Sequence, residues 1–238
     1  MNLFKTGTLA VALAAGSVLA GTAMASPTIT ASTTGPTFAV LDLGTATTAG
    51  FQNSTTITSP GFADIASITF SGGSPNASGV YGGSVTGVAT TPFPAGTPGD
   101  SMANYLVAQS HGGTVTVDFT SPQTSILLEW GTADAAAGYN LVTSNGTGGS
   151  QMVDGAMILA AAGLPSSDSG MTNFAVDITG LNPFTSLTFS DSTAVSAFEF
   201  DIGQMSSVPE PGSLALMAMG LAGLGFMARR RRQAKSSV

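Results

Sequence analysis

Two short stretches, VTVDF at residues 115–119 and FEFDI at residues 198–202, alternate apolar with polar side chains. Such alternation is typical of a β-strand with one face in a core and the other towards solvent. In the second stretch it places Phe198, Phe200 and Ile202 on the buried face and the intervening acids on the solvent face. These stretches predict a β-rich fold.

Similar short runs, rich in β-branched and aromatic residues and separated by Gly, Pro and Asn, recur along the chain. Many short strands at this spacing predict an all-β, antiparallel β-sandwich of jelly-roll-like form. Ser26–Gly35 is expected to be a loose leader, Thr90–Ser101 a long exposed loop, and Ala156–Gly163 a short helix. The further predicted strands are Thr37–Leu43, Ile65–Phe70, Gly83–Ala89, Tyr105–Ala108, Ser125–Trp130, Tyr139–Val142, Met152–Leu159, Asn173–Ile178 and Ser186–Phe189.

The charges are divided unevenly along the chain. All six lysines and arginines lie outside residues 26–208, whereas twelve of the thirteen acids lie inside them, so this segment has a formal charge of −12. A segment without cationic side chains cannot neutralise phosphates, which excludes nucleic-acid binding and disfavours docking to anionic lipid. Because the chain also has no Cys, neither disulfides nor thiolate metal sites are available to it.

The first 25 residues have the pattern of a secretory signal peptide. Lys5 supplies the positive charge, residues 9–20 are apolar, and Ala23 and Ala25 are the small residues that signal peptidase requires. Cleavage is expected before Ser26. The alternative is a retained N-terminal membrane helix, which the shortness of the apolar run disfavours.

The C-terminal end contains three ordered elements. Pro209, Glu210 and Pro211 form a rigid, non-helical segment, and the sixteen residues Ser213–Ala228 contain no charge. As a helix this run would be roughly 24 Å long, a little short for a membrane span. The arginine cluster that follows is expected on the cytoplasmic side, and it consists of Arg229, Arg230, Arg231 and Arg232. An ordinary single-pass anchor is the alternative.

This tail resembles the PEP-CTERM sorting signal, which exosortase recognises in Gram-negative bacteria that make extracellular polysaccharide. The resemblance implies that Pro209, Glu210 and Pro211 are read by the sorting enzyme and that the apolar helix, inserted transiently in the inner membrane, is removed after export. It divides the chain into a signal peptide (1–25), a β-sandwich ectodomain (26–207) and a sorting tail (208–238).

The ectodomain is also similar to a group of exosortase-dependent surface proteins. The similarity lies in the runs 130–134 and 197–201 and in the pair Tyr139-Asn140. Four residues separate Asp134 from Tyr139, a longer spacing than that group suggests. The group is defined by its sorting, so this similarity implies no particular chemistry.

Catalysis has little support in the sequence. A glycosidase needs two carboxyl groups in different environments, and the ectodomain has only Glu129 and Glu199 as glutamates, both expected on solvent faces of strands. His111 is the only histidine and is expected in a turn. No catalytic residue is predicted, although an undetected hydrolase remains an alternative.

Two kinds of binding site remain open. A sugar could bind to exposed aromatic rings, with Trp130, Tyr139 and Asn140 as candidates, although Trp130 could equally be core. Calcium prefers clustered oxygens, and Asp134, Glu199 and Asp201 are the candidate metal ligands. We therefore expect a non-enzymatic protein of the cell surface or extracellular matrix, with a carbohydrate-binding module of the exopolysaccharide matrix as the alternative.

Overall fold

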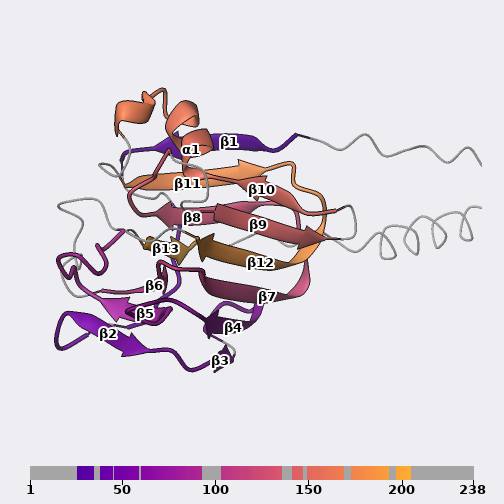
Figure 1. The fold of residues 1–238 in the computed structure, drawn as a ribbon. Helices are drawn as coiled ribbons and strands as arrows, with labels where there is room; N and C mark the ends of the chain where they lie inside the picture. Colours follow the sequence, from indigo (N-terminus) through magenta and orange to yellow (C-terminus); the bar gives the residue numbers. More distant parts are fainter. Residues whose placement is uncertain are drawn as a thin grey trace, which may run out of the picture.

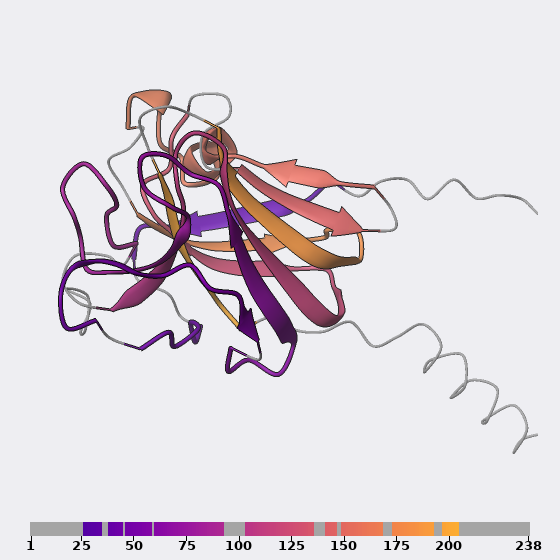
Figure 2. The ribbon, with the colours of Figure 1, turned by 60° about the horizontal axis from the view of Figure 1, so that its bottom comes forward.

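In the computed structural model, the described residues are 26–204, except 35–37, 45, 59, 93–102, 136–140, 147–148, 169–172 and 193–196. They form two antiparallel sheets that lie face to face as layers (Figures 1 and 2). The sandwich predicted from the sequence is confirmed. The signal peptide and the sorting tail lie outside the described residues.

The seven-stranded sheet follows the order β1 (Thr28–Ser32), β11 (Phe174–Thr179), β8 (Ile126–Trp130), β13 (Phe198–Ile202), β6 (Asn104–Ala108), β5 (Gly79–Gly82) and β2 (Gly50–Asn53). The six-stranded sheet follows the order β10 (Gln151–Val153), β9 (Leu141–Gly146), β12 (Phe184–Asp191), β7 (Gly113–Gln123), β4 (Ile65–Ser71) and β3 (Ile57–Thr58).

The core lies between the two sheets. The apolar residues of the two opening stretches point inwards, as the alternation predicted: Val115 and Val117 from β7, and Phe198 and Phe200 from β13, are fully buried. Phe200 also stacks on Phe189 of the facing sheet, with ring centroids 3.9 Å apart and planes 14° apart. Aromatic contact between the sheets therefore holds the centre of the sandwich together.

A short helix, α1 (Gly155–Ala161), follows β10 and packs against β1 (Figure 1). Asp154 caps it, because its side chain accepts a hydrogen bond of 2.9 Å from the backbone N–H of Met157. A single 3₁₀ turn, η1 (Ser166–Asp168), comes after it. The predicted helix is thus confirmed, whereas the strand predicted over Met152–Leu159 is wrong beyond Val153, where β10 ends.

Three predictions about the N-terminal half are wrong. Ser26–Gly35 is not a loose leader, because Thr28–Ser32 pairs along its length with β11. Within Gly83–Ala89 only an isolated bridge between Val85 and Ala89 forms, and the strand lies just before it. Within Thr37–Leu43 the described residues contain a bridge at Val40 but no strand.

The outer face of the seven-stranded sheet is partly covered as well. Residues 83–92, between β5 and β6, fold back over it and form a second apolar cluster. Tyr105 lies in this cluster, where its hydroxyl donates a hydrogen bond of 2.8 Å to the carbonyl of Gly83. The cluster consists of Tyr81, Ala89, Tyr105, Val107 and Ala197, with Val88 packed against it. Residues 83–92 therefore cover part of the face that carries the acids of β13.

Candidate functional site

The acids of β8 and β13 lie on the outer face of the seven-stranded sheet, as the alternation predicted, but they are not exposed. Glu129 and Asp201 are each 1% exposed, and Glu199 is 5% exposed. The expectation that Glu129 and Glu199 face solvent is therefore wrong. For Glu199 the reason is visible: the segment over the sheet brings the backbone N–H of Thr90 within 2.9 Å of its carboxylate, to which it donates a hydrogen bond.

Glu199 lies at a small polar cleft of about 260 Å³. The pKa of Glu199 is raised to about 8, and burial is the largest cause. The nearby charges of Asp191 and Asp134 also raise this pKa, whereas the hydrogen bond from Thr90 lowers it. A carboxyl group in this state can donate as well as accept a hydrogen bond near neutral pH. The other polar residues that line the cleft are Asn76, Thr90, Gln109, Ser110 and Thr132.

Glu129 and Asp201 lie directly opposite each other on the neighbouring strands β8 and β13. Both carboxylate oxygens of Glu129 and the Oδ2 of Asp201 are buried without a hydrogen-bond partner. Burial raises the pKa of Glu129 to about 7. Burial also holds the pKa of Asp201 well above its usual range, and the charges of Glu129 and Asp42 add to that effect.

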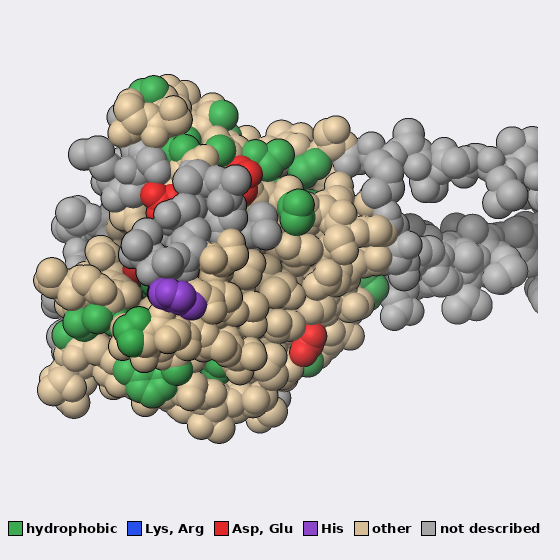
Figure 3. All heavy atoms as spheres, in the orientation of Figure 1, with side chains coloured by type: hydrophobic (Ala, Val, Ile, Leu, Met, Phe, Trp, Pro, Cys, Tyr) green, Lys and Arg blue, Asp and Glu red, His purple; other side chains and the backbone are tan. Residues whose placement is uncertain are grey.

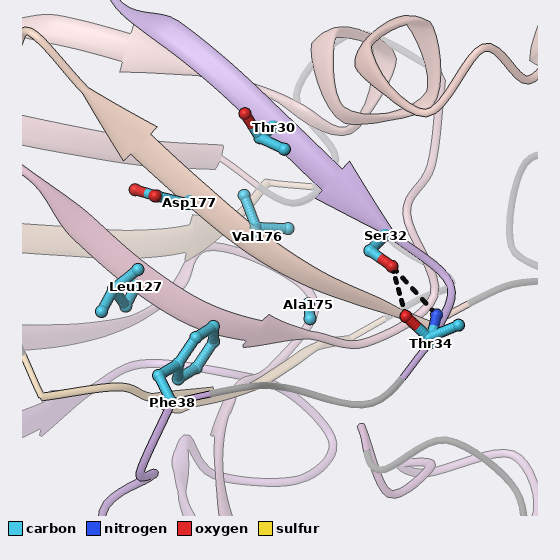
Figure 4. Close-up of a pocket in the computed structure, with 8 residues that line it drawn as sticks. All are labelled: Thr30, Ser32, Thr34, Phe38, Leu127, Ala175, Val176 and Asp177. Carbon is cyan, nitrogen blue, oxygen red and sulfur yellow. Dashed lines mark hydrogen bonds between the residues drawn. The ribbon is translucent and has the colours of Figure 1, made fainter.

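A second hollow, of about 360 Å³, lies on the same outer face near β1 and β11. Figure 4 shows Thr30, Leu127, Phe38 and Asp177 around it, with Ser32 and Thr34 hydrogen-bonded to each other at one end. Its lining is mainly aliphatic and hydroxyl-bearing, and Asp177 is its one ionisable residue. It therefore offers less chemistry than the cleft at Glu199.

Trp130 does not present a ring to a sugar. It is fully buried, and its ring centroid lies 4.6 Å from that of Phe198 in the core. Trp130 is therefore a core residue, and the prediction that it binds a sugar is wrong. The other two candidates for sugar binding, Tyr139 and Asn140, lie outside the described residues.

The three candidate metal ligands do not assemble. Glu199 and Asp201 share one strand and one face, and Asp134 lies near enough to affect the charge of Glu199. Even so, within the described ranges no three His, Cys, Asp or Glu side chains are close enough to hold a metal ion. The site proposed at Asp134, Glu199 and Asp201 is therefore not formed by these residues.

His111 lies in the turn between β6 and β7, as expected. Its φ of 62° is in the left-handed region that the tight turn requires, and its ring is exposed. Figure 3 shows this ring on a face where scattered acids are visible and the described residues include no Lys or Arg side chain. We therefore assign His111 a structural role in this turn.

A family profile described as the PEP-CTERM protein-sorting motif matches residues 207–232. The match includes Pro209, Glu210 and Pro211 together with the arginine cluster, so the resemblance seen in the sequence is confirmed. No curated protein and no solved structure matches the chain. Within the described residues, no helix has the length and apolar character needed to cross a membrane.

The chain therefore carries a PEP-CTERM protein-sorting motif at its C-terminal end. This motif marks an exported protein that depends on exosortase for sorting to the cell surface. The sequence alone was enough for that conclusion. The cleft at Glu199 and the buried acids on β8 and β13 were missed, because no local pattern reveals which loop covers a strand.

Proposed function

We propose that the ectodomain is a non-catalytic component of the cell surface or extracellular matrix of a Gram-negative bacterium. The observation that carries this proposal is the enclosure of Glu129. Both of its carboxylate oxygens are buried, so it cannot reach a substrate together with Glu199. A two-carboxylate hydrolase needs both groups at the scissile bond.

The proposal includes the fate of both ends of the chain. Signal peptidase removes residues 1–25, the segment Ser213–Ala228 is inserted transiently in the inner membrane, and exosortase then processes the chain near Pro209. The order of the three elements in the tail supports this route, because arginines after an apolar span are retained on the cytoplasmic side.

The sorting route is tested with the double variant Pro209→Ala, Glu210→Ala. We expect this variant to accumulate uncleaved in the membrane fraction, while the wild type is found without its tail. Intact mass spectrometry of the cell-surface and membrane fractions measures both ends at once. The matched control is Met205→Ala with Ser206→Ala, two changes just before the motif. Normal maturation of the Pro209→Ala, Glu210→Ala protein would show that the motif is not what the processing enzyme reads.

The absence of catalysis is tested by incubating the exported protein with extracellular polysaccharides and measuring released reducing ends. We expect no turnover above that of a boiled sample. If turnover is seen and is lost in Glu199→Gln or Glu129→Gln, the protein is a hydrolase and the proposal fails.

A second candidate function, carbohydrate binding, is favoured by the cleft at Glu199. This cleft brings two amides, hydroxyl groups and a carboxyl group together within about 260 Å³, and sugars are recognised by such combinations of donors and acceptors. Here the cleft replaces the exposed tryptophan that the sequence suggested.

Calorimetric titration with oligosaccharides selected on a glycan array tests this candidate. Binding should weaken at least tenfold in Asn76→Ala and Glu199→Gln, because each change removes a group that lines the cleft. Asn145→Ala is the control, since this exposed amide lies on β9 in the other sheet. Equal affinity for all three variants would place any sugar elsewhere.

A further inference from the structure

The buried acids Glu129 and Asp201 have no role in sorting or in the cleft. They lie opposite each other on adjacent central strands of the seven-stranded sheet. Each is 1% exposed, and three of their four carboxylate oxygens have no hydrogen-bond partner. An ionised carboxylate buried in this way loses its hydration, which is among the costliest changes that folding can impose.

Within the described part of the chain, no cationic side chain compensates these two acids. Lys and Arg are absent from residues 26–208, and the single histidine lies in the β6–β7 turn. Among the described residues, the ionisable groups near the pair on this side of the sheet are themselves acidic or neutral. They are Asp177 from β11, Glu199 from β13, Asp42 from the segment beside β13, and Tyr105 from β6. Every charge that these groups can carry is negative, so each disfavours ionisation of the pair.

A buried carboxyl pair without a cationic side chain can be neutralised by a proton or by a metal ion. A metal ion needs several oxygen ligands, and the described residues include no third acid close enough to join the pair in holding one. Two buried carboxyl groups on neighbouring strands can instead retain their protons, because burial and a like-charged neighbour both disfavour the ionised forms.

We propose that Glu129 and Asp201 form a buried proton-binding site that retains protons while the domain is folded. The consequence is a domain that is more stable in acid than in mild alkali. The raised pKa of both groups agrees with this assignment. The proposal is independent of the sorting route and of any ligand.

The direction of the pH dependence follows from proton linkage. A carboxyl group whose pKa is higher in the folded protein stabilises the fold fully below the pKa of the unfolded chain, and this contribution is lost as the pH rises through the folded value. For Glu129 that window extends from its ordinary pKa of 4.5 to about 7. Stability should therefore fall across this range because the unfolded chain releases protons that the folded domain retains.

The experiment measures urea unfolding of the exported protein from about pH 4.5 to about pH 8.5, the range in which a buried carboxyl group would titrate. The variants are Glu129→Gln, Asp201→Asn and the double variant, which imitate the neutral form. We expect the slope of unfolding free energy against pH to decrease in each variant and most in the double variant. A residual slope from Glu199 should remain in all of them. Asp64→Asn, a change outside this face, should keep the wild-type slope.

Two results would overturn the assignment. One is an unchanged pH slope in the double variant. The other is a rise in the wild-type melting temperature on adding Ca²⁺ or Mg²⁺ at about pH 8 that the double variant lacks, because the pair would then hold a metal ion.

Carboxyl ¹³C NMR of the wild type decides the question if the variants do not fold. A Glu129 resonance that titrates above about pH 6 supports the proposal. Titration near its ordinary pKa of 4.5 rejects it.

Discussion

At the scale of single residues, the aromatic side chains of β13 connect the two sheets in the core. Phe200 is fully buried and contacts Phe189 and Phe198, with ring centroids 3.9 Å and 5.1 Å away. Removing such a ring loses its transfer free energy and leaves a cavity that a sheet closes poorly. The packing of this ring therefore depends on both sheets at once.

We expect Phe200→Ala to lower the free energy of unfolding by about 3–5 kcal/mol. Phe51→Ala is a control of the same chemistry, because Phe51 is 49% exposed and touches the fold mainly through an edge contact with Tyr81. That contact limits its expected loss to about 1 kcal/mol. Urea denaturation measures both values, and equal losses would contradict the inferred core.

At the scale of elements, α1 shows how a local signal sets a boundary inside a β-rich chain. Asp154 ends the extended segment and caps the helix, and the helix stops before Gly163, whose φ of 71° suits glycine. Between these signals the run of alanines favours a helix. Short local hydrogen bonds therefore fix both ends of α1.

Asp154→Ala should destabilise the protein by about 1 kcal/mol, because the N–H of Met157 loses its acceptor. Ser166→Ala is the control, since this exposed residue lies in η1 after the helix, and it should change stability by less than about 0.5 kcal/mol. Thermal unfolding followed by circular dichroism gives both values. A loss in Ser166→Ala equal to that in Asp154→Ala would argue against the cap.

At the scale of the whole molecule, the ectodomain is strongly acidic and has no Lys or Arg side chain. Its formal charge is −12, with Lys and Arg absent from residues 26–208. Self-repulsion of this kind destabilises a compact state and decreases when salt screens it. Stability must therefore come from burial and backbone hydrogen bonds, with no contribution from Lys or Arg ion pairs within this segment.

Raising the salt concentration from about 0.01 M to about 0.15 M NaCl at neutral pH should raise the melting temperature by roughly 2–4 °C. At about pH 3, where most carboxyl groups are protonated, the same change in salt should have little effect. Differential scanning calorimetry at the two pH values measures both shifts. A melting temperature that falls with salt at neutral pH would mean that attractive charge pairs outweigh the repulsion.

Much of the fold could be predicted because its signals are local. Alternation and turn residues correctly predicted strands at Ile65–Phe70, Tyr105–Ala108 and Asn173–Ile178, which correspond to β4, β6 and β11. Thr28–Ser32 was missed because this strand is short and lies at the sheet edge, where it pairs with β11 and none of its side chains is fully buried. Its pairing partner lies far along the chain, beyond the reach of a local pattern.

The sequence by itself determined the sorting tail and the face on which each acid of β13 lies, because a sorting motif is a short run of consecutive residues and side chains alternate along any strand. Only the tertiary structure decided that Glu199 borders a cleft and that Glu129 meets Asp201 in a buried pair. Burial depends on which distant segments cover a face and which strands become neighbours, and neither is encoded within a single stretch of chain.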